Sequence, residues 1–78
     1  MKTPELVVRP RADVIDDLLE RDGHNRAWLA HEIDRSENYV HKLLAGDRRL
    51  SWSLACDMAY ALRVRPTTIC EIGQREAA

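Results

Sequence analysis

The sequence contains no phenylalanine, and aromatic residues make up only 5% of its 78 residues. A hydrophobic core must therefore be built from Leu, Ile, Val, Ala and Met. Strand patterns are nearly absent, whereas several helical patterns follow one another. The composition, 45% hydrophobic and 32% charged, is that of a globular domain. We expect a single all-α domain, a compact bundle of about five short helices.

Glycine and cysteine are also scarce. Three glycines do not form a glycine-rich phosphate loop, and Cys56 and Cys70 lack the spacing of zinc ligands. His24, His31 and His41 complete no metal or nucleophile constellation, so we expect no enzyme activity, no metal and no cofactor. Because no signal peptide or membrane-length apolar run is recognisable, we expect a cytoplasmic protein without a membrane segment. One small domain also leaves no room for a separate domain that senses a small-molecule ligand.

Charge is nearly balanced overall but is segregated along the chain. The formal net charge is −1, which is low for a protein that binds nucleic acid. Residues 13–22 carry five acids against one arginine, whereas residues 35–49 carry four bases against two acids. We therefore expect an acidic first helix and a basic surface over residues 35–49.

Residues 25–46 show the pattern of two short helices joined by a tight turn. Asn25 and Ser36 are suited to cap the two helices, and Gly46 is suited to end the second. Apolar residues recur at helical spacing in both segments: Leu29, Ala30 and Ile33, then Val40, Leu43 and Leu44. The spacing predicts a helix-turn-helix unit whose second helix buries one face and exposes the other.

The face expected to be exposed carries side chains that can hydrogen-bond a base edge or a phosphate: Glu37, Asn38, His41 and Lys42. The Asn38 amide has the geometry for a bidentate pair with adenine, and Lys42 lies one turn further on the same face. Glu37 has two open interpretations, acceptance from a cytosine amino group or interaction with the helix dipole. His41 and Tyr39 have three: packing, contact with sugar and phosphate, or projection into solvent. We assign Glu37, Asn38, His41 and Lys42 to base contacts.

This segment resembles the lambda-repressor/Cro-like (XRE-type) family of helix-turn-helix regulators. Matching positions are Leu29-Ala30, Ser36, Val40 and Gly46, and departures are Arg26 (Gln in the family), Asp34 (Gly), Arg35 (usually apolar) and Leu44 (often Glu). Asp34 weakens the match without breaking it, because Asp tolerates a left-handed turn better than most residues. The resemblance extends from about Val14 to Ile72.

The resemblance implies a sequence-specific DNA-binding regulator. The family uses the position of Arg26 and the loop after the second helix to hold the DNA backbone. We accordingly assign to phosphate contacts Asn25, Arg26, Arg35, Tyr39, Arg48 and Arg49. The family often dimerises through the start of its fifth helix, which implies a homodimer on an inverted-repeat operator in double-stranded DNA. The corresponding residues here are Val64, Arg65, Pro66, Thr67, Thr68 and Ile72.

The flanking segments complete the expected organisation. Residues 1–10 should form an extended arm because of Pro4 and Pro10, residues 11–73 the domain, and residues 74–78 a frayed tail. Three interpretations of the arm stay open: a floppy terminus, a basic arm reaching DNA, or a strand pairing with a second subunit. Further helices are expected from residues 11–13 to 22, from Ser51 to Arg63, and from Thr67 to Glu71.

Two functions from different classes fit this sequence. The first is a transcriptional regulator of the phage-repressor or Cro type, which acts by occupying its operator. The alternative is a helix-turn-helix module that binds protein, such as the antitoxin of a toxin–antitoxin pair, and the acidic first helix favours it.

Overall fold

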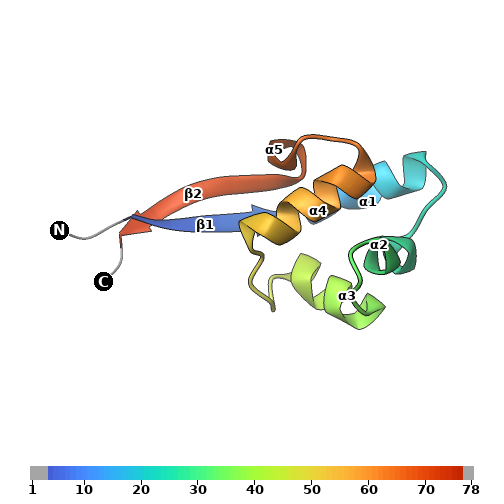
Figure 1. Cartoon of the computed structure of the whole chain (residues 1–78), viewed down its shortest axis with the longest axis horizontal. Helices are drawn as coiled ribbons and strands as arrows, with labels where there is room; N and C mark the ends of the chain where they lie inside the picture. The colour runs from blue at the N-terminus through green and yellow to red at the C-terminus, as the bar shows by residue number, and fades with distance from the viewer. Residues whose placement is uncertain (1–3, 77–78) are drawn as a thin grey trace.

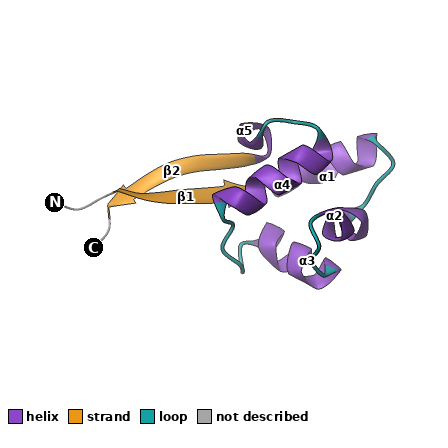
Figure 2. Cartoon of the chain, in the orientation of Figure 1, coloured by secondary structure: helices purple, strands orange, loops and turns teal. Residues whose placement is uncertain are grey.

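Five helices and one two-stranded sheet make up the part of the chain that the computed structural model describes, the backbone of residues 4–76 and the side chains of residues 7–73. The elements are β1 (Pro4–Pro10), α1 (Ala12–Arg21), α2 (Arg26–Glu32), α3 (Glu37–Ala45), α4 (Trp52–Leu62), α5 (Pro66–Ile69) and β2 (Cys70–Glu76). The helices gather at one end, and the sheet projects from them along the longest dimension (Figures 1 and 2). The extents are 47 × 23 × 19 Å.

The helices begin and end where local chemistry dictates. The side chains of Asn25, Ser36 and Ser51 each accept a hydrogen bond from a backbone N–H in the first turn of α2, α3 and α4. Gly46 ends α3 in the left-handed conformation, with φ of 89°. Pro66 stands in the first turn of α5, where its missing N–H removes no helical bond. These caps confirm the boundaries predicted for α2, α3 and α4.

The core is aliphatic, as the absence of phenylalanine requires. Met58 and Ala55 of α4 have no exposed surface, and neither have Ile15 of α1, Leu29 of α2 and Val40 of α3. Each helix from α1 to α4 therefore contributes one apolar stripe to a shared interior. The helix-turn-helix pair α2–α3 lies on one side of α4, and α5 lies on the other (Figure 1).

The expectation of an all-α fold is wrong at the two ends of the chain. Strand β1 pairs antiparallel with β2, from Pro4 opposite Glu76 to Pro10 opposite Cys70. The helix expected from Thr67 to Glu71 ends at Ile69, and Ile72, which follows in β2, is 41% exposed. An isolated helix this short is marginal, whereas pairing with β1 gives the same backbone hydrogen-bond partners along one edge.

The pairing register matches opposite charges and joins apolar residues. Arg9 stands opposite Glu71, and Val8 stands opposite Ile72. Such cross-strand pairs favour one register over a shifted one. The extended arm therefore pairs with the C-terminal strand of its own chain. The tail expected from residue 74 is strand up to Glu76, and residues 77 and 78 lie outside the described part, as does Lys2.

Candidate nucleic-acid interface

The turn between α2 and α3 is fixed by backbone hydrogen bonds and by one residue in the left-handed region. Asp34 has φ of 57°, a conformation that Asp adopts more readily than most residues. The Arg35 N–H donates to the Ala30 carbonyl at 2.9 Å, which closes the end of α2. The Ser36 Oγ then accepts from the Tyr39 N–H at 3.0 Å and starts α3. The two helices are thus held in one relative orientation without a glycine in the turn.

Helix α3 is buried on one face and exposed on the other. Val40, Leu43 and Leu44 pack into the core with at most 8% of their surface exposed. The four residues predicted to contact bases are all exposed, namely Glu37, Asn38, His41 and Lys42. Their side chains share one helix and one surface, so a partner that lies along α3 can meet them together.

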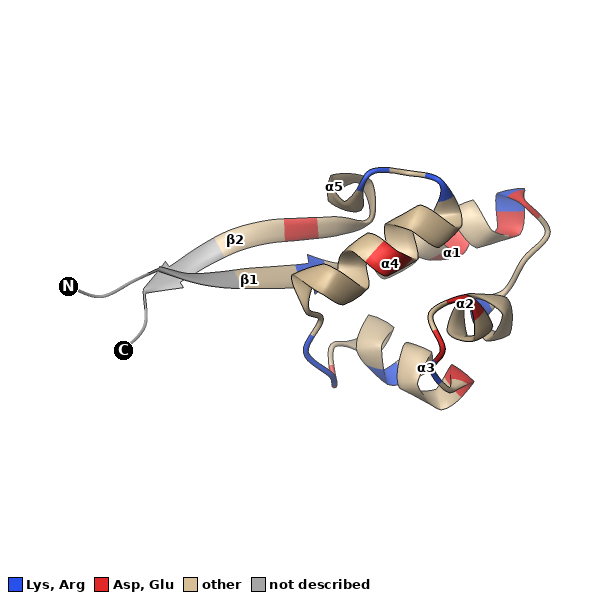
Figure 3. Ribbon diagram, viewed as in Figure 1, with Lys and Arg blue, Asp and Glu red and all other residues tan. Residues whose placement is uncertain are grey.

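Most residues assigned to phosphates surround this surface. Arg35, Arg48 and Arg49 are exposed, and Figure 3 shows basic positions on α3 and on the α3–α4 connection. The Arg35 guanidinium lies 5.7 Å from the centre of the Tyr39 ring, which is half-buried. This cation–π contact steadies the arginine beside the first turn of α3. Asn25 is exposed, and its side-chain oxygen is used to cap α2 through the Trp28 N–H at 2.9 Å.

Arg26 differs from the free cation that the sequence suggested. Its Nε donates to Asp16 Oδ1 at 2.9 Å and its Nη2 to Asp16 Oδ2 at 2.7 Å, so the carboxylate of α1 compensates its charge. Its Nη1 lies 3.0 Å from Nδ1 of His41 on α3. These hydrogen bonds lower the pKa of Asp16 from its ordinary value of 3.8 and raise the pKa of Arg26. Arg26 is therefore engaged inside the protein before any phosphate approaches.

Sequence reasoning missed this cluster because its members are far apart in sequence. Asp16 and Arg26 are ten positions apart and lie on different helices, and no short motif marks such a pair. Sequence reasoning also left out Tyr60, which is 88% exposed on α4, and the stacking of His24 on Trp28 with ring centres 3.8 Å apart. The opposite charges of Arg9 and Glu71 agree with the sheet, but by themselves they do not specify which segments pair.

Other kinds of site receive no support from the described residues. Within residues 4–76, no group of three or more His, Cys, Asp or Glu side chains is placed to hold a metal ion. No helix in that range has the length and apolar character needed to cross a membrane. The exposed face of α3 and its basic surroundings are thus the candidate site.

Comparison with known proteins finds solved structures that share this fold. No protein-family model matches the chain, and no curated protein matches it in sequence. Among solved structures, it is similar to the restriction-modification controller protein C.AhdI from Aeromonas hydrophila, with a TM-score of 0.65 and 23% identity over 73% of this chain and 86% of that one. The chain therefore shares the fold of that controller protein.

A second solved structure has the same helix-turn-helix fold. It is a protein from Bacteroides fragilis to which a DNA-binding role has been provisionally assigned. The TM-score is 0.64 and the identity 21%, and the match covers 86% of this chain and all of that one. Together the two likenesses confirm the predicted helix-turn-helix fold.

The ion pair between Asp16 and Arg26 gives this helix-turn-helix domain a pH-dependent stability. The pKa of Asp16 is below 3.8 in the folded protein, so the stabilisation is present at neutral pH and is lost as the pH falls below 3.8 through the folded-state value. We expect Asp16→Asn to lower Tm at pH 7, by the equivalent of about 1 kcal/mol or less because solvent screens this pair. The gap from wild type should close in acid.

Thermal unfolding between pH 7 and pH 2 followed by circular dichroism measures this gap. Asp17→Asn is the matched control, because Asp17 is exposed on the same helix and forms no ion pair with the described residues. A gap for Asp16→Asn that stays constant down to pH 2 would show that the Asp16 carboxylate is not what stabilises the fold.

Proposed function

We propose that this protein is a sequence-specific, double-stranded DNA-binding transcriptional regulator that acts by occupying its operator. The observation that carries the proposal is the exposed polar face of α3, which is held rigidly by a buried apolar face and flanked by basic residues. The similarity of its fold to a restriction-modification controller agrees with it. A bound protein of this size would exclude polymerase from an overlapping promoter in the cytoplasm, as a phage-type repressor or Cro does.

In this proposal α3 is the recognition helix and lies in the major groove. Asn38, near its start, pairs with an adenine edge through its amide, and Lys42 reaches a guanine or a phosphate from the next turn. Glu37 accepts from a cytosine amino group. The N-terminal part of a recognition helix is the part that approaches base edges in such complexes, and Glu37 and Asn38 occupy it.

The phosphates on either side are held by the surrounding polar and basic residues. Arg35 and Tyr39 lie next to the start of α3, and Arg48 and Arg49 follow its end. The two groups can therefore contact DNA phosphates on both sides of the groove. Asn25 and Arg26 at the start of α2 complete the set. The acidic first helix is the feature that favours a protein-binding module. Its repulsion of the DNA backbone is weaker than its composition suggests, because Asp16 is neutralised by Arg26.

We also propose that two copies bind an inverted repeat. The predicted dimer residues lie at the α4–α5 turn, at the start of α5 and in β2, and this turn and α5 are on the opposite side of α4 from α3 (Figure 1). The set comprises Val64, Arg65, Pro66, Thr67, Thr68 and Ile72, of which Ile72 is 41% exposed. A dimer formed there leaves both recognition helices free, and half-sites would lie about one helical turn apart.

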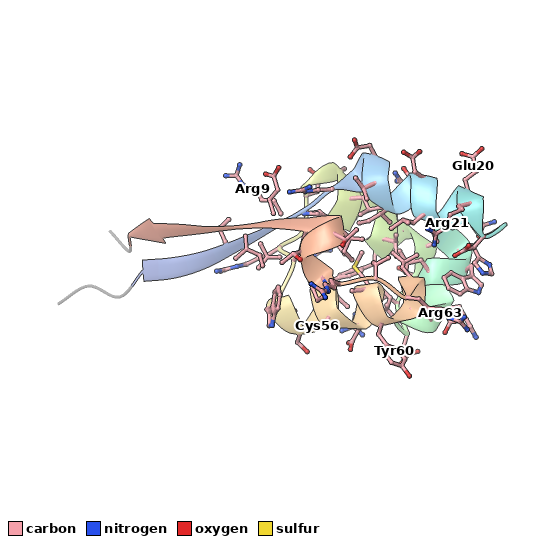
Figure 4. The ribbon with its side chains drawn as sticks, turned by 90° about the horizontal axis from the view of Figure 1, so that it is seen from above. Arg9, Glu20, Arg21, Cys56, Tyr60 and Arg63 are labelled. Carbon is pink, nitrogen blue, oxygen red and sulfur yellow. The ribbon has the colours of Figure 1, made fainter. Side chains whose placement is uncertain are left out.

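The charge of the α3–α4 connection yields the first test of DNA binding. If Arg48 contacts a phosphate, Arg48→Ala should weaken binding to every duplex and lower the slope of log K against log salt by about one unit. Arg21→Ala is the control: it removes the same charge from the end of α1, where Arg21 is exposed and pairs with Asp22 at 3.3 Å (Figure 4). Equal slopes for the two variants, measured by fluorescence anisotropy, would place the connection away from DNA.

Base reading by Asn38 is tested by comparing cognate with scrambled DNA. Asn38→Ala should cost about 1–3 kcal/mol on the selected site and relax preference at one base pair. Selection from a random duplex library before and after the substitution measures both quantities. An equal loss on cognate and scrambled duplexes would make Asn38 a phosphate contact.

Assembly is tested by sedimentation with DNA of two lengths. We expect two chains on an inverted-repeat duplex and one chain on a half-site duplex. Ile72→Glu should weaken the two-chain complex, because it adds charge to the proposed interface, and should leave half-site binding unchanged. A single chain on the best natural site would contradict the dimer.

A further inference from the structure

Three side chains from three different helices meet beside the exposed face of α3. Asp16 of α1 accepts two hydrogen bonds from Arg26 of α2, at 2.9 and 2.7 Å, and Arg26 lies 3.0 Å from His41 of α3. Arg26 uses its Nε and Nη2 for the carboxylate, so its remaining terminal nitrogen, Nη1, is the one that meets the imidazole. The three groups form a chain that runs from α1 to the candidate recognition helix.

The chemistry of the guanidinium fixes the direction of each hydrogen bond in this chain. Arginine has donors and no acceptor, so in the contact with His41 it must donate and Nδ1 of the imidazole must accept. An accepting Nδ1 carries no proton, and a neutral imidazole then carries its proton on Nε2. His41 is therefore a neutral donor through Nε2–H, and its other ring nitrogen is occupied.

The contact with Asp16 gives this arrangement its rigidity. A bidentate pair of a planar guanidinium with a carboxylate fixes the plane of the guanidinium as well as its position. The Arg26 side chain is 28% exposed, which limits the alternatives open to it. The Asp16 carboxylate is charged at neutral pH, and the hydrogen bonds from Arg26 lower its pKa further below the ordinary value of 3.8, so the pair persists there. Other charged groups on the helix of His41 are Glu37, one turn earlier, and the adjacent Lys42.

We propose that Asp16 and Arg26 are positioning residues that hold His41 as a neutral Nε2–H donor to an acceptor atom of the bound DNA. This inference rests on the proposed function and makes it specific: it excludes two of the roles that the sequence left open for His41, packing and projection into solvent. The acceptor is either the N7 or O6 of a purine or a phosphate oxygen. Because His41 is neutral and Asp16 compensates the charge of Arg26, these three residues fix the direction of the hydrogen bond to DNA and add little charge to the contact.

The first experiment examines the protein without DNA. Long-range ¹⁵N–¹H NMR at about pH 8, where an ordinary imidazole is neutral, reports which ring nitrogen carries the proton. We expect the Nε2–H form alone for His41 in the wild type, and an added Nδ1–H population in Arg26→Met, which keeps the length of the side chain but removes its donors. A substantial Nδ1–H population in the wild type would overturn the proposal.

The second experiment is a double-mutant cycle in DNA affinity. Asp16→Asn is compared with Asp17→Asn, which makes the same charge change on the same helix, each with His41 or with His41→Ala. With His41 present, Asp16→Asn should bind the selected site about 2–10-fold more weakly than Asp17→Asn, the range expected for one misplaced hydrogen bond. With His41→Ala the two should bind equally. An equal difference in both backgrounds would show that Asp16 does not act through His41.

The same cycle identifies the acceptor and separates this inference from the proposed function. A loss confined to the cognate duplex supports the donor role and assigns a base edge, whereas an equal loss on a scrambled duplex supports it and assigns a phosphate. If the wild type binds no duplex at all, the proposed function and this role fall together. If the wild type binds but the cycle shows no coupling, the positioning role alone is overturned.

Discussion

Burial of the apolar face of α3 is the interaction on which the rest of this structure depends. A nine-residue helix is marginal by itself, and Val40 and Leu43, both fully buried, hold α3 against the core. That burial is also what turns the opposite face outward and fixes it in one orientation. The polar side chains of α3 keep one orientation toward solvent, because the aliphatic side chains on the other face cannot leave the core without a large loss of stability.

The helical part of the fold could be predicted from the sequence because its signals are local. Asn25, Ser36 and Ser51 cap helices through atoms three residues away, and the apolar stripes repeat every three or four residues. The sheet could not be predicted in this way. Its strands join the two ends of the chain, and Leu6-Val7-Val8 carries no information about which segment will pair with it. The fifth helix was predicted to end at Glu71 and ends at Ile69 for the same reason, because the strand pairing that begins at Cys70 involves a distant segment.

The same distinction between local sequence signals and tertiary contacts applies to the candidate site. Exposure of Asn38 and Lys42 follows from helical periodicity, so the exposed polar face of α3 was predictable from the sequence alone. The surroundings of Arg26 were not, because Asp16 and His41 reach it only when three helices have packed. The sequence treats Arg26 as a positive charge, whereas the structure makes it the central member of a hydrogen-bonded chain. A residue's charge can be read from the sequence, but its availability to a ligand depends on tertiary contacts.

The sheet that joins the two ends also has a consequence for the order in which the molecule folds and opens. The contacts within and between α2, α3 and α4 connect segments close in sequence, whereas β1 and β2 are separated by nearly the whole chain. Pairing distant segments carries a loop-closure cost that falls once the intervening helices are compact, so the strands should close last. By the same reasoning they should open first, as a local fluctuation well below global unfolding. The free end of the sheet lies away from α3, so α3 can stay in place while the two strands separate (Figure 1).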